Sequence, residues 1–394
     1  MNTLSNALLI YFIFIVLIIT LIPFNFQIPN QIEISWHIGP SDTITNIFLF
    51  IPLGFLFRLI HRHKHTLYSL PTFFFGAFLS ITIEISQIFS PSRYTNPIDV
   101  LTNGFGAWLG AIALNMLSKK IREKERTKIF DLELPLLGQV YLLIPLLWLN
   151  GLALGDDPTR LLLIFLLGLS GSFVLGMIWK NRWMQHKTFS PKRLSLITVC
   201  WFMIGVLPSF FRYPLQIMGQ VVLIGIFTML LMQILQKITL KERRIEQRTL
   251  QIVFPLYIFY LALATYWSNL PARGNIHDVF QGVAFNKRIE VIFLAVELVA
   301  SYTLMGYMIA GLRGRQKDSQ GYTFGLAFFI ALTTSLLTDL TNPSSSIADI
   351  NISRTILVGS MSLYGALIYS LQLNAIQRLR KKPHKDYNHA NNQL

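Results

Sequence analysis

Residues 8–24 read LLIYFIFIVLIITLIPF, an apolar run without a charged side chain. About 20 such residues in a helix cross the hydrocarbon core of a bilayer. The run is longer than the core of a signal peptide, and it lacks a preceding basic stretch and a small-residue cleavage site after it. We therefore expect it to be retained as a transmembrane helix.

Similar apolar runs recur along the chain of 394 residues, separated by short polar segments. Hydrophobic residues make up 53% of the sequence and charged residues 13%, whereas soluble domains contain about 25% charged residues. The sequence predicts an all-α fold, a polytopic transmembrane bundle of about twelve helices. We expect these helices near residues 6–25, 43–60, 69–90, 98–117, 134–154, 159–179, 194–211, 214–236, 250–270, 289–311, 321–340 and 354–373.

Lysine and arginine residues predict the orientation of this bundle. If the predicted helices alternate across the membrane, 27 of the 34 basic residues fall on one side. The seven on the other side are Arg93, Arg160, Arg212, Arg273, Lys287, Arg288 and Arg354. Because cytoplasmic loops are enriched in basic residues, both termini are expected in the cytoplasm, with the basic loops near anionic lipid head groups.

The same composition argues against several classes of function. The net charge of +15 resides in short clusters between apolar runs, so nucleic acid is not an expected partner. The single cysteine, Cys200, excludes an intrachain disulfide. No H-E-x-x-H motif, glycine-rich nucleotide loop or G-x-S-x-G elbow occurs in the sequence. We expect no metal, no cofactor and no catalytic residue; the sequence leaves the oligomeric state open.

An internal repeat relates two parts of the chain. Residues 76–106 parallel residues 325–356 at an offset of about 250, which pairs Glu84 with Thr334, and residues 50–55 parallel residues 302–307. Both copies begin on the same predicted side, so the repeat is parallel. Four-helix units are predicted at 1–120, 130–240 and 249–375, followed by a basic cytoplasmic tail at 376–394. Chance similarity between apolar helices is the alternative.

Polar residues inside apolar helices concentrate at the predicted external ends of the first unit, where each must be paired or reach water. They are spaced to share helix faces, and Arg93 lies in the short turn between two of the helices. The candidates for ligand binding are Asp42, Asn46, Glu84, Gln87, Arg93, Asp99 and Asn103. A further acid, Glu297, lies within a later apolar helix, at a position that the repeat pairs with Asn46.

Several residues of this region also have a structural interpretation. Asp42 and Asp99 are typical helix N-cap residues. Glu84 and Arg93 could form a buried ion pair. Gly106 and Gly110 are spaced for close helix packing rather than binding.

These residues resemble the VanZ-like family over about residues 10–118. The resemblance rests on NIFLFIPLGF at 46–55, EISQIF at 84–89, Arg93, and DVLTNGFGAWLG at 99–110. Members are small multi-helix membrane proteins, some associated with low-level teicoplanin resistance and others found among envelope genes. The resemblance implies an envelope role and carries over to all seven candidates, whereas residues 289–373 match as a degenerate copy.

The leading hypothesis is a non-enzymatic protein of the bacterial cytoplasmic membrane with an externally open polar cleft. Its expected partners are membrane lipids and a lipid-linked precursor or peptidoglycan-related head group. The second hypothesis is a proton-coupled transporter or lipid flippase that uses Glu84 and Asp99. An intramembrane enzyme acting on lipid-linked substrates is the third.

Overall fold

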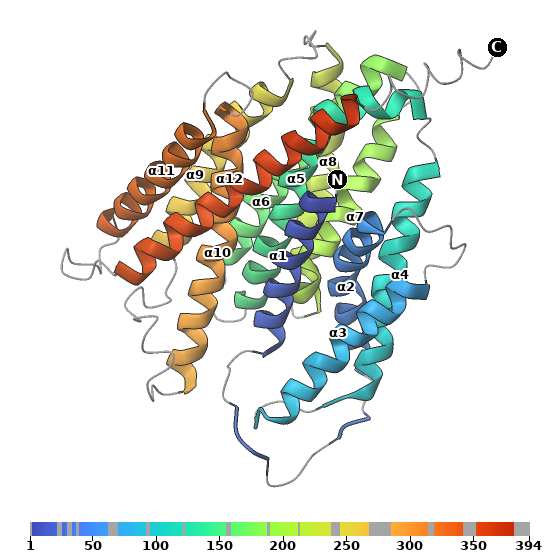
Figure 1. The fold of residues 1–394 in the computed structure, drawn as a ribbon, viewed down its shortest axis with the longest axis vertical. Coiled ribbons are helices and arrows are strands. Elements are labelled where there is room, and N and C mark those ends of the chain that lie inside the picture. The colour runs from blue at the N-terminus through green and yellow to red at the C-terminus, as the bar shows by residue number, and fades with distance from the viewer. Residues whose placement is uncertain are drawn as a thin grey trace. The chain divides into compact units, whose positions relative to one another are not determined.

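The computed structural model describes most of the chain, and its regular structure is helical (Figure 1). The described residues are 2–21, 26–29, 34–36, 39–61, 70–91, 95–119, 123–154, 159–186, 190–211, 213–237, 245–267, 285–313, 319–341 and 352–381. They form twelve α-helices, which confirms the predicted all-α bundle. The helices are α1 (Asn2–Leu21), α2 (Pro40–Ile60), α3 (Leu70–Ile88), α4 (Pro97–Lys119), α5 (Glu123–Ala153), α6 (Arg160–His186), α7 (Pro191–Phe210), α8 (Pro214–Lys237), α9 (Ile245–Trp267), α10 (Phe285–Arg313), α11 (Gln320–Thr341) and α12 (Ile352–Lys381).

Within the described residues, eleven of these helices are long and apolar enough to cross a membrane. The chain is therefore a multi-pass membrane protein. The exception is α4, whose polar side chains Asn103 and Asn115 and whose three glycines lower its hydropathy. The same small residues allow α4 to approach its neighbours closely.

Several helices extend beyond their predicted apolar spans. α5 has 31 residues, α6 has 27 and α12 has 30, and each extends at the end where basic residues gather. Lysine, arginine and glutamate are good helix formers, so the helix continues where the apolar pattern stops. The hydrophobic pattern locates the membrane-spanning part of a helix but not its ends.

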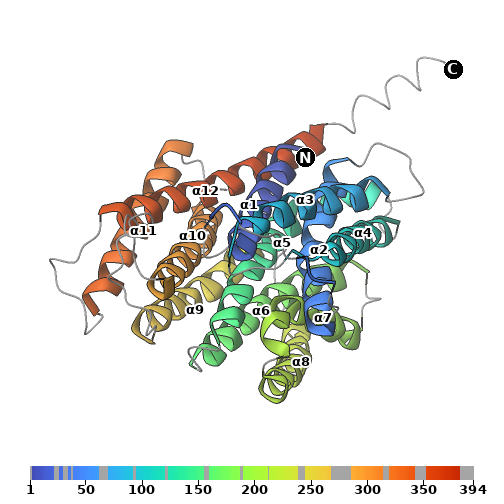
Figure 2. The same cartoon turned by 90° about the horizontal axis from the view of Figure 1, so that it is seen from below.

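The chain divides into two compact units. The smaller unit contains residues 2–121 and 274–296, and the larger unit contains residues 122–273 and 297–394. In the larger unit, α6 packs against α5, α8 and α9 (Figure 2). The middle predicted four-helix region and most of the last one thus share one compact unit, and the division into three four-helix units stays a prediction.

Glycines bring α2 and α4 into backbone contact in the smaller unit. A Cβ atom added to Gly54 would collide with the carbonyl oxygen of Ala107, and one added to Gly110 would collide with that of Ile51. The predicted packing role of Gly110 is confirmed. α3 lies against the same helix, with the ring of Phe73 directly over Gly104.

The larger unit contains a crossing of the same kind between α10 and α12. A Cβ atom on Gly306 would collide with the carbonyl oxygen of Ser362, and one on Gly365 would collide with that of Thr303. These four residues correspond to Gly54, Ala107, Gly110 and Ile51 at offsets of 252 for the first helix and 255 for the second.

The contact between α11 and α12 corresponds to that between α3 and α4 at the same offset of 255. Phe328 lies over Gly359 as Phe73 lies over Gly104. The register predicted from the sequence differs by five residues, since apolar helices resemble one another at several offsets. In the register of the contacts, Glu84 corresponds to Asp339 rather than to Thr334. Asp349, the predicted partner of Asp99, lies outside the described residues.

Candidate functional site

The carboxylate of Glu84 is held by the turn that joins α3 to α4. Glu84 is buried, and its Oε2 accepts a hydrogen bond of 2.8 Å from the backbone N–H of Asn96. The hydroxyl of Thr95 donates to the Glu84 carbonyl oxygen at 3.3 Å. The backbone of Ser35, from the segment before α2, pairs with the carbonyl of Thr95 at 2.9 Å. Three parts of the chain thus fix the position of this acid.

Two further acids lie beside this site: Asp99 on α4 is near Glu84, and Asp42 on α2 is near Asp99. The side-chain amide of Asn46 donates a hydrogen bond to the Asp99 carboxylate. Asp42 lies one turn before Asn46 on α2 and is exposed. Asp99 interacts electrostatically with both Asp42 and Glu84. These three acids and Asn46, hereafter the polar cluster, come from three helices, as their spacing predicts.

Asn103 and Gln87 make contacts of a different kind. Asn103 is buried, and its amide nitrogen donates to the Ser80 hydroxyl at 2.8 Å. Its Oδ1 has no hydrogen-bond donor among the described residues. Gln87 donates to the Thr20 carbonyl oxygen at 3.0 Å, which ties α3 to α1. Asn103 therefore keeps one acceptor for a further group, whereas Gln87 already serves helix packing.

The capping roles considered for the two aspartates are wrong. The N-cap of α2 is Gly39, and Asp42 lies within the first helical turn. At α4, the Asn96 side chain accepts from the backbone N–H of Ile98 at 3.1 Å, in front of Asp99. Arg93, the predicted partner of Glu84, lies outside the described residues.

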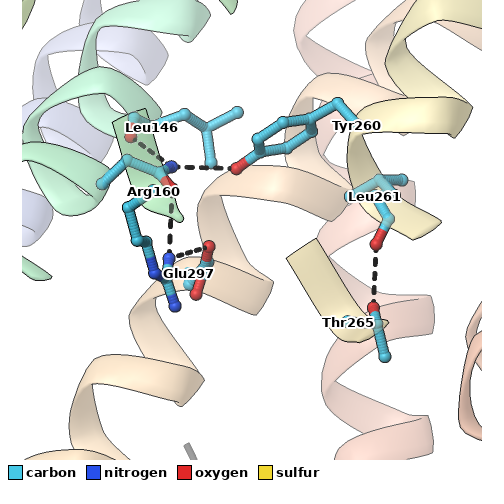
Figure 3. Close-up of polar contacts among 7 residues, drawn as sticks. Leu146, Arg160, Tyr260, Leu261, Thr265 and Glu297 are labelled. Atoms are coloured by element: carbon cyan, nitrogen blue, oxygen red, sulfur yellow. Dashed lines mark hydrogen bonds and ion pairs between the residues drawn. The ribbon is translucent and has the colours of Figure 1, made fainter. Parts of the chain in front are cut away.

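A second buried polar network lies in the larger unit, and the sequence did not predict it (Figure 3). Arg160 Nη1 on α6 donates to Glu297 Oε1 on α10 at 2.7 Å and to Asn150 Oδ1 on α5 at 3.1 Å. Asn150 in turn donates to the hydroxyl of Tyr260 on α9 at 3.0 Å. The sequence does show two opposite charges inside apolar spans, which could have indicated an ion pair. It gave no reason to pair them with each other, because they lie 137 positions apart.

Neither polar region forms a metal centre in the part of the chain that the structure describes. No group of three or more His, Cys, Asp or Glu side chains there could hold a metal ion. The polar cluster therefore offers hydrogen-bond acceptors and negative charge, and it suits a ligand that donates hydrogen bonds.

Comparisons with known proteins support the resemblance of the N-terminal segment. The VanZ/LLP1 family model matches residues 3–118. This segment is VanZ-like. Over 88 residues, 22% of the chain, the sequence is 31% identical to Protein VanZ of Enterococcus faecium. The match covers 53% of that protein, so the chain spans about half the length of this relative. No solved structure matches the chain.

The VanZ-like segment contains α1 to α4 and every candidate residue of the first unit. The Arg160 network lies outside this segment. The likeness to VanZ therefore bears on the polar cluster, and the second network has to be interpreted from its own chemistry.

Proposed function

We propose that the VanZ-like segment binds a component of the bacterial cell envelope through the polar cluster and Asn103. The main support is the gathering of three acids in one place. Like charges repel, and acids near hydrocarbon are costly unless they are paired or protonated, so this arrangement is a poor way to stabilise a fold. A ligand that carries hydroxyl, amide N–H or ammonium groups would offset that cost.

The head group of a lipid-linked precursor, or a peptidoglycan-related fragment, carries such donors. Its anionic part would bind Arg93, which lies between α3 and α4 in the sequence. The segment would act at the outer face of the cytoplasmic membrane, with both termini inside. That orientation is supported by the 27 basic residues on the other face.

The cellular role would be envelope homeostasis or glycopeptide susceptibility, which can be measured in growing cells. The test variant combines Glu84→Gln with Asp99→Asn, which keeps side-chain size and removes two charges. The control is Ser86→Ala on α3, because the Ser86 hydroxyl donates a hydrogen bond within its own helix, to the carbonyl of Thr82 at 2.8 Å.

Cells carrying the control should resist teicoplanin as cells with the unaltered protein do. Cells carrying the double variant should be as susceptible as cells without the protein. Equal protection by the double variant, at equal membrane levels, would contradict the proposed role.

One observation favours a second candidate function, proton-coupled transport or lipid flipping. Glu84 is buried within α3 and lies within electrostatic range of Asp99, and paired acids of this kind carry protons in transporters. This function requires lipid or solute flux into liposomes that depends on a pH gradient and is lost in Glu84→Gln. Simple binding requires no such flux.

A further inference from the structure

The Arg160 network stands apart from the polar cluster, because none of its residues belongs to the VanZ-like segment. Arg160 is the first residue of α6 and has 1% of its surface exposed. The N-terminus of a helix carries partial positive charge and repels a cation, and burial adds a desolvation cost. Both the helix N-terminus and the burial thus make the charge of Arg160 unfavourable at this position.

The Glu297 carboxylate offsets that cost, but it does not explain why the charges are there. Replacing a buried ion pair by packed apolar residues is often neutral or stabilising. The helix N-terminus, which makes the position poor for a cation, and the guanidinium itself would both favour a bound anion. The chemistry of the position is therefore that of an anion site.

The surrounding residues hold the guanidinium in place. Arg160 Nη1 is shared between Glu297 and Asn150. Asn150 is fixed by the Leu146 carbonyl oxygen at 2.9 Å and by the Tyr260 hydroxyl (Figure 3). Three helices besides α6 contribute these groups, so the guanidinium is oriented before any ligand arrives.

Glu297, the α10 residue of this network, also has a counterpart on α2 in the smaller unit. At the offset of 252 that the α10–α12 contacts define, Glu297 corresponds to Thr45, the neighbour of Asn46. In both crossings, α2–α4 and α10–α12, the earlier helix therefore has polar residues at the corresponding turn. In the smaller unit that turn belongs to the polar cluster, and in the larger unit it carries Glu297.

We propose that Arg160 is a binding residue for an anionic group, a phosphate or a carboxylate, and that Glu297 occupies the guanidinium until the ligand displaces it. The Glu297 side chain is 10% exposed, against 1% for Arg160, so the ligand would approach from the Glu297 side. The anion could belong to a lipid head group or be free in solution. This site is independent of the polar cluster.

The test measures anion binding to the full-length chain in phosphatidylcholine nanodiscs. The probes are inorganic phosphate at constant ionic strength and phosphatidylglycerol added to the nanodisc, and the readout is the shift of the thermal unfolding midpoint with concentration. Glu297→Gln removes the competing carboxylate. We expect it to bind at least one probe about tenfold more tightly than the unaltered chain, the minimum implied by coupling energies of close charge pairs.

The double variant with Arg160→Gln and Glu297→Gln leaves no unpaired charge, so it should fold and yet show no shift. The control is Arg58→Gln in the smaller unit, where Arg58 donates to Asn115 at 3.4 Å; it should respond as the unaltered chain does. A response to phosphate alone supports a free anion, and a response to phosphatidylglycerol alone supports a head group. No response of Glu297→Gln to either probe, or an equal response of the double variant, would overturn the proposal.

Discussion

Two buried acids of this protein are stabilised by different means. Glu84 accepts from a backbone N–H at 2.8 Å, whereas Glu297 accepts from a guanidinium at 2.7 Å. From helical spacing and a short turn, the sequence predicted that acids and amides of three adjacent helices gather near Glu84, but it did not predict the backbone N–H that holds the carboxylate. It could not predict the partner of Glu297, because that contact depends on how four helices pack.

A residue-scale prediction concerns this pair. Glu297→Leu alone should lower the free energy of unfolding by about 3–5 kcal/mol, because it leaves Arg160 charged in an apolar interior. The double change, Arg160→Met with Glu297→Leu, should lie close to the unaltered chain. Chemical unfolding in detergent micelles measures both. A double variant as unstable as the single one would show that the network contributes more than charge compensation.

At the scale of helices, glycine positions decide how close two backbones come. All twelve helices were predictable from apolar runs, since membrane-spanning segments must bury their own backbone polar groups. The register of the repeat was not predictable in the same way. Gly54 and Gly306 were matched by sequence, but only their contacts with α4 and α12 fix the offset of 255 for the second helix.

These contacts predict unequal effects of alanine substitutions. Gly54→Ala and Gly306→Ala should each destabilise the protein by about 1–3 kcal/mol, because the new methyl group meets helix backbone that cannot move aside. Gly219 on α8 has no neighbouring atom within 4 Å of an added Cβ, so Gly219→Ala should be neutral or stabilise by up to about 1 kcal/mol. Thermal unfolding compares the three, and equal midpoints would refute close helix contact at the crossings.

For the whole molecule, the orientation depends on α4. Eleven described helices meet the length and composition of a membrane span, and α4 does not. If α4 failed to cross, every later loop would change sides relative to the loop with Arg58, Arg62 and Lys64, and the split of basic residues would become 25 to nine instead of 27 to seven. The separation is sharper with twelve crossings, so we expect α4 to cross, and the side of the segment after α4 has to be measured.

Reporter fusions test that orientation. Fusions after Lys120, Arg244 and Arg380 should report the cytoplasm, and a fusion at Asp157 should report the exterior. The fusion after Lys120 is the most informative when it is compared with one after Lys64, since α3 and α4 lie between the two points. Signals from opposite sides would mean that α4 does not span the membrane.

Binding by the VanZ-like segment is tested most directly by native mass spectrometry of the chain purified from bacterial membranes. The unaltered chain and the Ser86→Ala control should carry the same envelope-derived species. The variant with Glu84→Gln and Asp99→Asn should lose it while retaining ordinary phospholipids, because two of the three carboxylates that accept from the ligand are gone. If all three proteins carry the same species in the same amounts, the polar cluster is not a binding site.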